Sequence, residues 1–414
     1  MNLRPRPVPS TNPDAADVAP PRLNPAGSHM ALTGEAVIHD IDPAAQDAAP
    51  PSVRGPLAPA GKAPAPASDR QTFAVEELAV VLSHFDLGTL ESVHVFPRGS
   101  RKAPKLVVIA QDQQTYLLKR RARGRDDPQK VAFCHGIQMH LAQRQFPLPH
   151  LIGTRVDNNS MLKYGGATYE LFEYIQGDGY DQSLEATTEA GRTLALFHKL
   201  LADHRPKFKP SRGSYHASKS VSNACNAIPT TLQKTEPQAD RQEITRLTQF
   251  LHQAYKAAAR TVHAEGLNQW PVGIAHSDWH PGNILFRGQR VVAVIDYDAA
   301  RLQQRIVDVA NGALQFSIIG GGDDPKRWPD YLDESRFKRF LRGYDSVPDA
   351  VLSRAELRVL PWLMIEALIA ESVIPIAATG TFARLPGGRF LPMVQRKVRW
   401  VQDNVDKLIA AAEE

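Results

Sequence analysis

The order of the hydrophobic patterns along the chain limits its fold more than any other feature of the sequence. Residues 73–85 have the apolar spacing of a helix, and a second helical stretch spans 129–143. Around them lie five short strand-like runs: "LESVHVFP", "KLVVIA", "TYLLKR", "PHLIGTRV" and "ATYELFEYI". This order predicts an antiparallel sheet with a few helices, in a first lobe that ends near Gly177.

Helical patterns dominate the chain after residue 177. The expected helices span 185–203, 239–265, 303–317, 333–343, 353–377 and 391–412. The exception is "NILFRGQRVVAVIDYD", which reads as two strands joined by a turn at Arg287–Gly288. Because 414 residues exceed the usual size of one domain, two core-forming lobes are expected. We predict an α+β fold in two lobes, a small β-rich lobe at 70–177 and a larger helical lobe at 178–414.

Residues 1–69 differ from the rest of the chain in composition. They hold 14 of the 32 prolines, are rich in alanine, and contain no aromatic residue. Such a segment buries too little apolar surface to offset the loss of chain entropy on folding. We therefore expect a disordered tail over 1–69.

Composition also excludes several classes of protein. A net charge of +5 without a dense Lys/Arg stripe argues against nucleic-acid binding. No apolar run approaches the length of a membrane span, so no membrane insertion is expected. The two cysteines, Cys134 and Cys225, form no disulfide framework. Together these features favour a cytoplasmic protein.

The stretch "HSDWHPGNILF" at 276–286 is the densest group of chemically active residues. His276, Asp278 and His280 have the alternation of a metal cluster, but no fourth ligand lies nearby. Ser277 lacks the G-x-S-x-G setting of a hydrolase nucleophile. Phosphoryl transfer fits better, because a carboxylate orients the acceptor hydroxyl while an amide oxygen and a second carboxylate hold Mg²⁺. A purely structural alternative is that these side chains cap a turn.

The segments "IAHSDWHPGNILF" and "VVAVIDYDAA" closely resemble the aminoglycoside phosphotransferase-like superfamily of small-molecule kinases, which includes homoserine, choline and methylthioribose kinases. The resemblance extends over about residues 73–410 and implies a bilobal protein-kinase-like fold that uses ATP and Mg²⁺. It also implies that Asp278 is the catalytic base and that His276 braces the catalytic loop. Asn283 and Asp296 are then the Mg²⁺ ligands.

On the nucleotide side, the resemblance points to Lys119 at the end of "TYLLKR" as the residue that holds the phosphates. Gly99 and Ser100, in the loop "PRGSRKAPK", stand where the family covers the phosphates, and the backbone at Glu173 to Ile175 stands where it binds adenine. The usual acidic partner of the lysine is missing, because residues 128–156 contain no Asp or Glu. His135 lies near the expected position. The partner is then Asp126, Asp127 or a carboxylate elsewhere.

Other residues keep two interpretations each. Trp279 either walls the acceptor pocket or packs in the core, and Asp298 either adds a carboxylate near the metal or is a solvated loop acid. Asp308 is expected to brace the catalytic loop, and His198 to be a packed core histidine. Glu366, Glu371, Trp328 and Trp362 are candidates for binding a cationic acceptor, and Arg301, Arg305 and Arg384 for binding a carboxylate.

We therefore expect an ATP- and Mg²⁺-dependent kinase that phosphorylates a hydroxyl of a small metabolite. The competing hypothesis is a non-catalytic, kinase-shaped binding or scaffold protein. It is motivated by the missing helix acid and by the long Pro/Ala-rich tail.

Overall fold

The computed structural model describes residues 38–39, 70–97, 99–321 and 324–414. Its first lobe is built on a sheet with strand order β1-β2-β3-β4-β7-β5, in which β6 pairs with β7. The strands are β1 (Ile38–His39), β2 (Leu90–Val95), β3 (Lys105–Ala110), β4 (Thr115–Arg120), β5 (Leu151–Ile152), β6 (Leu162–Tyr164) and β7 (Ala167–Glu173). β1 pairs with β2 in parallel, and the other pairings are antiparallel. Apart from β1, the expected tail at 1–69 lies outside the described residues.

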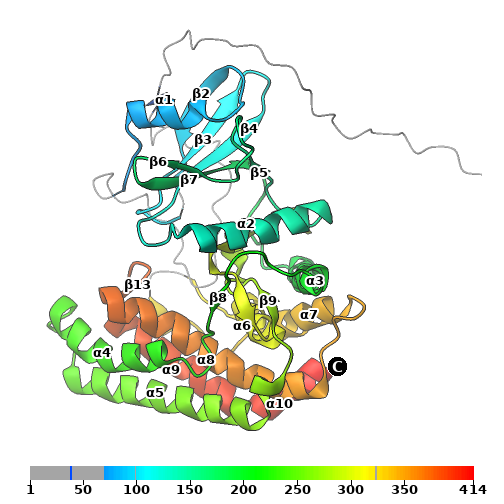
Figure 1. Cartoon of the computed structure of the whole chain (residues 1–414). Coiled ribbons are helices and arrows are strands. Elements are labelled where there is room, and N and C mark those ends of the chain that lie inside the picture. Colours follow the sequence, from blue (N-terminus) through cyan, green and yellow to red (C-terminus); the bar gives the residue numbers. More distant parts are fainter. Residues whose placement is uncertain (1–37, 40–69, 98, 322–323) are drawn as a thin grey trace, which may run out of the picture. The chain divides into compact units, whose positions relative to one another are not determined.

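Helix α1 (Val75–Ser83) packs on this sheet, next to β2 in Figure 1. Its buried Leu78, Val81 and Leu82 share one core with Leu106 and Val108 of β3. Burial alternates along β3 because successive side chains of a strand point to opposite faces. Every second residue of the run "KLVVIA", beginning with Leu106, is therefore buried on the side of the sheet that faces α1.

Helix α2 (Pro128–Gln143) connects the sheet to the helical lobe. Asp127 caps its N-terminus by accepting a hydrogen bond from the Gln129 amide. Its Phe133, Ile137 and Leu141 recur at helical spacing and belong to the large hydrophobic core that also contains Phe197 of α3 (Leu184–Leu201). Helix α2, where the acidic partner of Lys119 was expected, is thus anchored in the second lobe's core.

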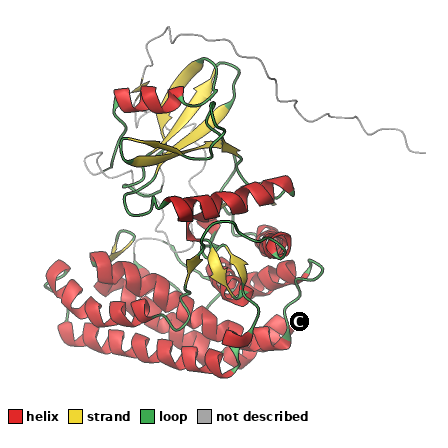
Figure 2. Ribbon diagram, viewed as in Figure 1, coloured by secondary structure: helices red, strands yellow, loops and turns green. Residues whose placement is uncertain are grey.

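Helices make up most of the second lobe, while the strands gather mainly in the first (Figure 2). The remaining helices are α4 (Lys219–Thr235), α5 (Arg241–Ala264), α6 (Arg305–Ser317), α7 (Glu334–Asp345), α8 (Arg354–Thr379), α9 (Gly387–Asp403) and α10 (Val405–Glu413). Short strands accompany them. One three-stranded sheet has β8 (Ser211–Arg212) and β9 (Gly273–Ala275) on either side of β12 (Arg301–Gln303), and two hairpins are β10–β11 (Ile284–Arg287, Arg290–Val294) and β13–β14 (Thr381–Phe382, Leu385–Pro386).

Helices α3 and α7 approach each other closely at two glycines. A Cβ atom on Gly191 would lie 2.0 Å from the Phe340 carbonyl oxygen, and one on Gly343 would lie 2.0 Å from the Thr188 carbonyl oxygen. Any larger residue would force these helices apart. Since α3 carries Phe197, which contacts His276, and His198, which bonds to Asp308, this close packing supports one side of the loop at 276–286.

Helix α8 corrects the sequence-based statement that no segment approaches the length of a membrane span. This 26-residue helix is long and apolar enough to cross a membrane by length and composition alone. It is nevertheless mostly buried, and its Leu360, Met364 and Leu368 belong to the large core. Burial within the lobe accounts for its apolar sequence.

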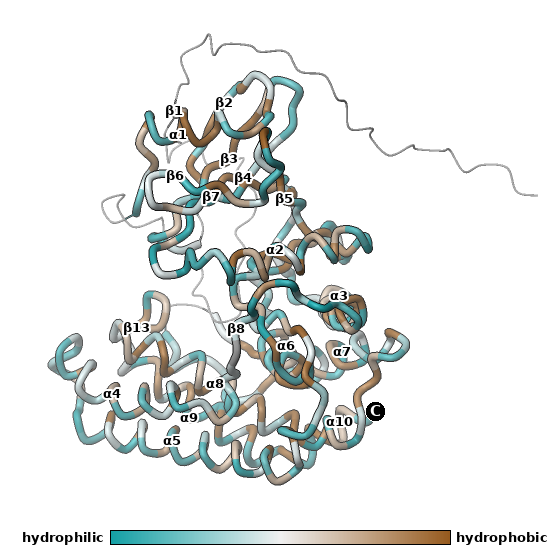
Figure 3. The backbone as a smooth tube through the Cα atoms, in the orientation of Figure 1, coloured by the Kyte–Doolittle hydropathy of each residue, from teal (hydrophilic) through white to brown (hydrophobic). Residues whose placement is uncertain are grey.

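The α+β architecture in two lobes is confirmed, but several element predictions were wrong in detail. The helix expected at 391–412 is interrupted at Asn404, between α9 and α10. The strand expected at 149–156 has only two residues. Helix α4 was missed because its sequence is mostly polar and contains Pro229. Hydrophilic and hydrophobic residues are interspersed along α4 (Figure 3), and only one stripe is buried, at Val221, Ala224, Cys225, Ile228 and Leu232.

Candidate active site

The motif at 276–286 forms a tight loop between β9 and β10. Ser277 has a positive φ of 64°, and a short 3-10 helix at Pro281–Asn283 follows. The His280 Nδ1 atom accepts a hydrogen bond of 3.0 Å from the Gly282 amide. The Asn283 Nδ2 atom donates to the Asp278 Oδ2 atom at 2.8 Å and to the Asp278 carbonyl at 3.0 Å. The Asp278 side chain is 41% exposed, so its carboxylate is held in place yet accessible.

Asp308 of α6 holds the start of this loop. Its carboxylate accepts hydrogen bonds from the His276 amide (2.7 Å), the Ser277 amide (2.9 Å) and His198 Nε2 (3.2 Å). Burial alone would raise the pKa of Asp308, but these hydrogen bonds and the nearby histidines keep it below its usual value. The carboxylate is therefore ionised and braces the loop, as expected. The His198 side chain is only 7% exposed, as expected for a packed histidine, and it also bonds to Asp308 and to the Tyr344 hydroxyl (2.8 Å).

The His276 ring lies in an aromatic cluster. It contacts Phe197, Trp279 and Tyr297, and neither ring nitrogen has a hydrogen-bond partner among the described residues. Burial lowers the pKa of His276, so its ring is neutral at physiological pH. His276 thus takes part in the bracing through its backbone amide. Trp279 is fully buried in the same cluster, so of its two interpretations the structure supports core packing.

Asn283 and Asp296 are joined through the backbone. The Ile295 amide donates to the Asn283 carbonyl at 2.9 Å, which brings the residue after it, Asp296, next to the loop. Asp296 is exposed and adopts left-handed backbone angles (φ 61°, ψ 68°). The protein around it displaces part of its hydration, which would raise the pKa of Asp296, but the positive charges of Lys119 and Lys105 keep this pKa low. Because Asn283 uses its Nδ2 on Asp278, its amide oxygen remains free to accept, and a carboxylate with an amide oxygen suits Mg²⁺.

The alternative metal cluster of His276, Asp278 and His280 is not supported. Among the residues that the structure describes, no group of three or more His, Cys, Asp or Glu side chains is placed to hold an ion. The His276 ring is buried in the aromatic cluster, and the His280 Nε2 atom lies 3.7 Å from the Asp278 Oδ1 atom. The alternation along the sequence does not bring the three side chains to a common point.

Lys119 has a carboxylate partner, but it does not come from α2. Its Nζ atom lies 2.8 Å from Asp298 Oδ2 and 3.8 Å from Glu170 Oε2. Glu170 is the direct cross-strand neighbour of Lys119, on β7. Burial would lower the pKa of Lys119, but these two carboxylates raise it. Of the open possibilities, Asp127 caps α2 and Asp126 accepts from the Gly124 amide, so the partner is a carboxylate elsewhere.

Glu170 is the centre of a buried ionic network. Its Oε1 atom accepts a hydrogen bond from Arg121 Nη2 at 2.7 Å and lies 2.6 Å from His135 Nε2. His135, which stands where an acidic residue was expected, therefore contacts the acid Glu170 instead. Burial would raise the pKa of Glu170, whereas Lys119, His135 and Arg121 lower it strongly. Asp298, expected either to add a carboxylate near the metal or to be a solvated loop acid, pairs with Lys119 and with Arg121 (2.7 Å). This pairing joins β4 to the loop after Asp296.

Sequence analysis missed Lys105, which starts β3 directly opposite Lys119. It forms no ion pair with any of the described residues, and burial and the charge of Lys119 lower its pKa. A Cβ atom on Gly99 (φ 87°) would lie 2.8 Å from the Lys105 Nζ atom, so the loop passes directly over this ammonium group. The pairing of "KLVVIA" with "TYLLKR", which aligns the two lysines, was the available signal.

The other residues predicted to bind the nucleotide are Ser100 and the backbone at Glu173 to Ile175. Ser100 is exposed and its hydroxyl accepts from the Lys102 amide at 3.3 Å. The Glu173 amide donates to the His150 carbonyl at 2.8 Å. The Ile175 amide has no hydrogen-bond partner in the described part of the chain.

Several of the residues predicted to bind the acceptor already have partners within the protein. Glu366 accepts from His216 Nδ1 (2.8 Å) and from the Ala217 amide (2.9 Å), and Arg305 is paired with Glu356. Trp328 is buried in the core, and Arg384 is exposed. Glu371 of α8 accepts a hydrogen bond from Gln315 of α6. Arg301 lies close enough to Asp308 and Asp278 for their charges to raise its pKa, although burial lowers the pKa overall.

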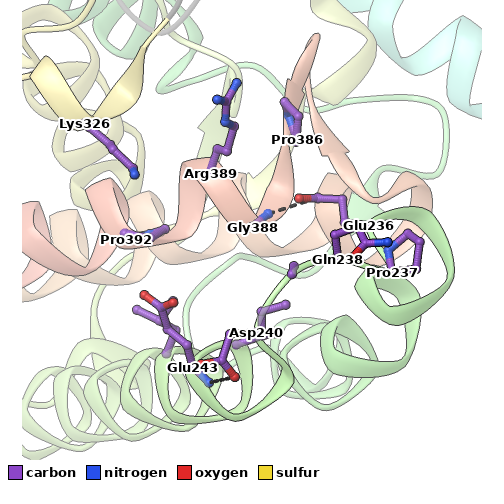
Figure 4. Close-up of a pocket in the computed structure, with 13 residues that line it drawn as sticks. Glu236, Pro237, Gln238, Asp240, Glu243, Lys326, Pro386, Gly388, Arg389 and Pro392 are labelled. Atoms are coloured by element: carbon purple, nitrogen blue, oxygen red, sulfur yellow. Dashed lines mark hydrogen bonds between the residues drawn. The ribbon is translucent and has the colours of Figure 1, made fainter.

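A surface cavity of about 530 Å³ lies elsewhere, between the α4–α5 junction and α9 (Figure 4). Two of its three acidic side chains have structural partners: Glu236 accepts from the Gly388 amide at 3.0 Å, and Asp240 caps α5. None of the motif residues lines it. We therefore place the candidate active site at the catalytic loop.

Known proteins resemble the chain in both sequence and fold. Homoserine kinases from Xanthobacter autotrophicus and Sinorhizobium medicae are 26% and 25% identical to it, over 70% of this chain and 81% and 79% of theirs. A structure of amicoumacin kinase, with AMP-PNP, Ca²⁺ and amicoumacin, superposes with a TM-score of 0.58 at 13% identity, covering 80% of this chain and 94% of that one. An aminoglycoside phosphotransferase from Alicyclobacillus acidocaldarius gives 0.55 at 16% identity, covering 84% and 98%.

A family model decides between the two functions that the sequence left open. The model of the phosphotransferase enzyme family matches residues 96–363, which include the loop at 276–286, Asp296, Lys105 and Lys119. This match favours a small-molecule kinase over a non-catalytic scaffold. The chain belongs to the phosphotransferase enzyme family.

Proposed function

We propose that this protein transfers the γ-phosphoryl group of ATP, in a Mg²⁺-dependent reaction, to a hydroxyl of a small metabolite. The observation that carries the proposal is the meeting of Asp278, Asn283 and Asp296 around one loop braced by Asp308. The proposed division of labour is a nucleotide lobe at 70–177 and a catalytic and acceptor lobe at 178–414, acting in the cytoplasm.

Asp278 is the proposed catalytic base. Its accessible carboxylate accepts the acceptor's hydroxyl hydrogen and orients the oxygen for attack. Asn283 keeps the carboxylate in place through its Nδ2 atom, and its amide oxygen and the Asp296 carboxylate are the groups that would hold Mg²⁺. When bound, Mg²⁺ would neutralise charge on the nucleotide phosphates. The neutral ring of His276 supports the loop without exchanging a proton.

Lys119 and Lys105 are the proposed phosphate-binding cations. Two lysines directly opposite each other on adjacent strands repel, and a phosphate group between them relieves that repulsion. Lys119 then exchanges Asp298 for the phosphates, while Arg121 retains Asp298. Gly99 lets the loop approach, with Ser100 beside it, and the backbone at Glu173 to Ile175 is the proposed adenine contact.

The test is ATP consumption measured with a panel of hydroxyl metabolites. Homoserine comes first because the named relatives are homoserine kinases, followed by choline, sugars and aminoglycosides. We expect turnover with at least one acceptor, and a loss of about 10²- to 10⁴-fold in kcat in Asp278→Asn, the range that general bases contribute. Asp406→Asn, an exposed acid on α10, is the matched control. Undiminished turnover in Asp278→Asn would refute the assignment of the base.

A further inference from the structure

Strand β12 lies beside the first residues of the catalytic loop. It pairs with β9 in the antiparallel sense, so that Arg301 is the direct neighbour of Ala275, the residue before His276. Gln303 points to the same side of β12 as Arg301, because side chains alternate along a strand. Gln303 donates a hydrogen bond of 3.1 Å to the Ser277 hydroxyl. The Arg301 side chain therefore lies on the side of β12 that faces the catalytic loop.

The guanidinium group of Arg301 is held in one orientation, yet most of its donors are free. Its Nε atom donates to the Ala299 carbonyl at 2.9 Å, and neither Nη atom bonds to another residue in the described part of the chain. Arg305, four residues later, differs because it pairs with Glu356 through Nε and Nη2. Arg301 thus presents its two Nη atoms, which can bind a carboxylate through two parallel hydrogen bonds.

The positive charge of Arg301 is only partly compensated by its surroundings. Burial lowers the pKa of Arg301, and the negative charges of Asp308 and Asp278 offset this only in part. Both acids have other partners, since Asp308 accepts from the amides of the loop and Asp278 from Asn283. A further anion at this position would therefore be stabilised by a cation that the protein leaves unpaired.

Arg301 and the proposed Mg²⁺ ligands lie at opposite ends of the catalytic loop. Arg301 is next to the residue that precedes the loop, whereas Asn283 and Asp296 meet where the loop ends. The cations with the largest effect on Asp296 are the two phosphate-binding lysines, while Arg301 responds to Asp308 and Asp278. A molecule whose hydroxyl meets Asp278 can thus extend toward Arg301, with the nucleotide phosphates on the other side.

Glu371 of α8, a further acid near Asp278, does not oppose an anion here. Burial and then the charge of Asp278 raise the pKa of Glu371 to about 8, and its carboxyl group accepts a hydrogen bond from Gln315. Glu371 is therefore mostly protonated at physiological pH and adds little negative charge.

We propose that Arg301 binds a carboxylate of the acceptor, which makes the acceptor a small hydroxy acid. This inference rests on the proposed function. The two Nη atoms donate to the two carboxylate oxygens while the hydroxyl of the same molecule meets Asp278. No bond forms or breaks at Arg301, so this residue determines which acceptor binds and how it is oriented.

The experiment compares each carboxylate acceptor with its amide. The pairs are homoserine with homoserinamide, and 4-hydroxybutanoate with 4-hydroxybutanamide; the second pair has no amine and so tests the carboxylate alone. We expect wild type to have a lower KM for the carboxylate in at least one pair. Arg301→Met should raise that KM about 10- to 100-fold, as expected for loss of charge-assisted hydrogen bonds. KM for the amide and KM for ATP should stay within about twofold.

Further variants separate binding from a structural role. Arg301→Lys keeps the charge but loses the paired Nη atoms, so its KM should lie between those of wild type and Arg301→Met. Arg339→Met, on the exposed side of α7, is the control for loss of one positive charge and should keep the wild-type KM. Arg301→Met should unfold at nearly the wild-type urea concentration, because its side chain makes one hydrogen bond among the described residues. A purely structural arginine would instead lower stability and raise KM for carboxylate and amide alike.

Equal KM values for carboxylate and amide in wild type would overturn the subsite, as would an unchanged preference in Arg301→Met. A fall in kcat with every acceptor, together with a higher KM for ATP, would assign Arg301 to the phosphates and also overturn it. Failure of both carboxylate acceptors while ATP–Mg²⁺ binds in a thermal-shift assay would do the same. If ATP–Mg²⁺ does not bind, the proposed function fails and the subsite with it. Nucleotide binding therefore distinguishes the two failures.

Discussion

The two halves of the candidate site hold a buried carboxylate in opposite ways. On the catalytic side, Asp308 is satisfied by two backbone amides and one histidine. On the nucleotide side, Glu170 is surrounded by the side chains of Lys119, Arg121 and His135. Backbone donors fix a loop in one conformation, whereas long cationic side chains can exchange partners. We infer that the catalytic loop is built before any ligand arrives, and that the nucleotide side rearranges when phosphates bind.

The largest expected effect tests the catalytic half directly. Asp296→Asn should reduce kcat by at least about 100-fold, comparable to loss of one group that stabilises developing charge in a transition state. Because the Asp296 side chain is exposed, urea unfolding should be almost unchanged. Stabilisation of the folded protein by ATP and Mg²⁺ in a thermal-shift assay should disappear in the variant. Retained stabilisation would argue against Asp296 as a metal ligand.

The second largest effect is expected from Asp308, which holds the start of the catalytic loop. Asp308→Ala leaves two backbone amides and His198 without their acceptor, so the free energy of unfolding should fall by about 3 kcal/mol or more, as for buried donors that lose their partners. Urea denaturation measures the change. A variant that keeps full stability and full kcat would show that the loop does not depend on Asp308.

The ionic network around Glu170 should make the free energy of unfolding depend on pH. The folded-state pKa of Glu170 is held below the value of an unfolded glutamate, so the folded protein takes up this proton later than the unfolded chain as pH falls. Its stabilisation is present above the unfolded pKa and is lost as pH falls through the window below about 5. Wild type should therefore lose free energy of unfolding more steeply than Glu170→Gln. Parallel curves between about pH 5 and 3 would contradict the network.

The smallest expected effect separates the two lysines. Lys105→Met should raise KM for ATP about tenfold, the loss of one charge-assisted contact to a phosphate, with little change in stability. Lys130→Met, on the exposed side of α2, is the control for loss of one positive charge. An unchanged KM in Lys105→Met would leave Lys119 as the sole phosphate-binding lysine.

The sequence predicted those features whose determinants are close together along the chain. The Asn283–Asp278 hydrogen bond spans five residues, and the hairpin that leads to Asp296 follows directly. The residues of the catalytic loop could therefore be identified from the sequence motif. The sheet and the longer helices followed from hydrophobic spacing. Helix α4 did not, because tertiary packing supports its weakly apolar sequence.

The ionic network could not be read in the same way. Lys119 and Asp298 are 179 residues apart, and Arg121 and Glu170 are 49 apart. Nothing local marks such pairs, since only the register of β4 against β7 brings Glu170 beside Lys119. The absence of an acid from α2 was visible in the sequence, but its replacement by a strand residue was not.

The most direct measurement is a crystal structure of the protein with a non-hydrolysable ATP analogue and Mg²⁺. We predict Mg²⁺ at about 2.1 Å from both the Asn283 amide oxygen and the Asp296 carboxylate, the usual distance for this ion. The phosphates should contact Lys119 and Lys105, and the Asp278 carboxylate should face the γ-phosphate. A nucleotide bound away from the loop, or a metal held without Asn283 and Asp296, would contradict the account.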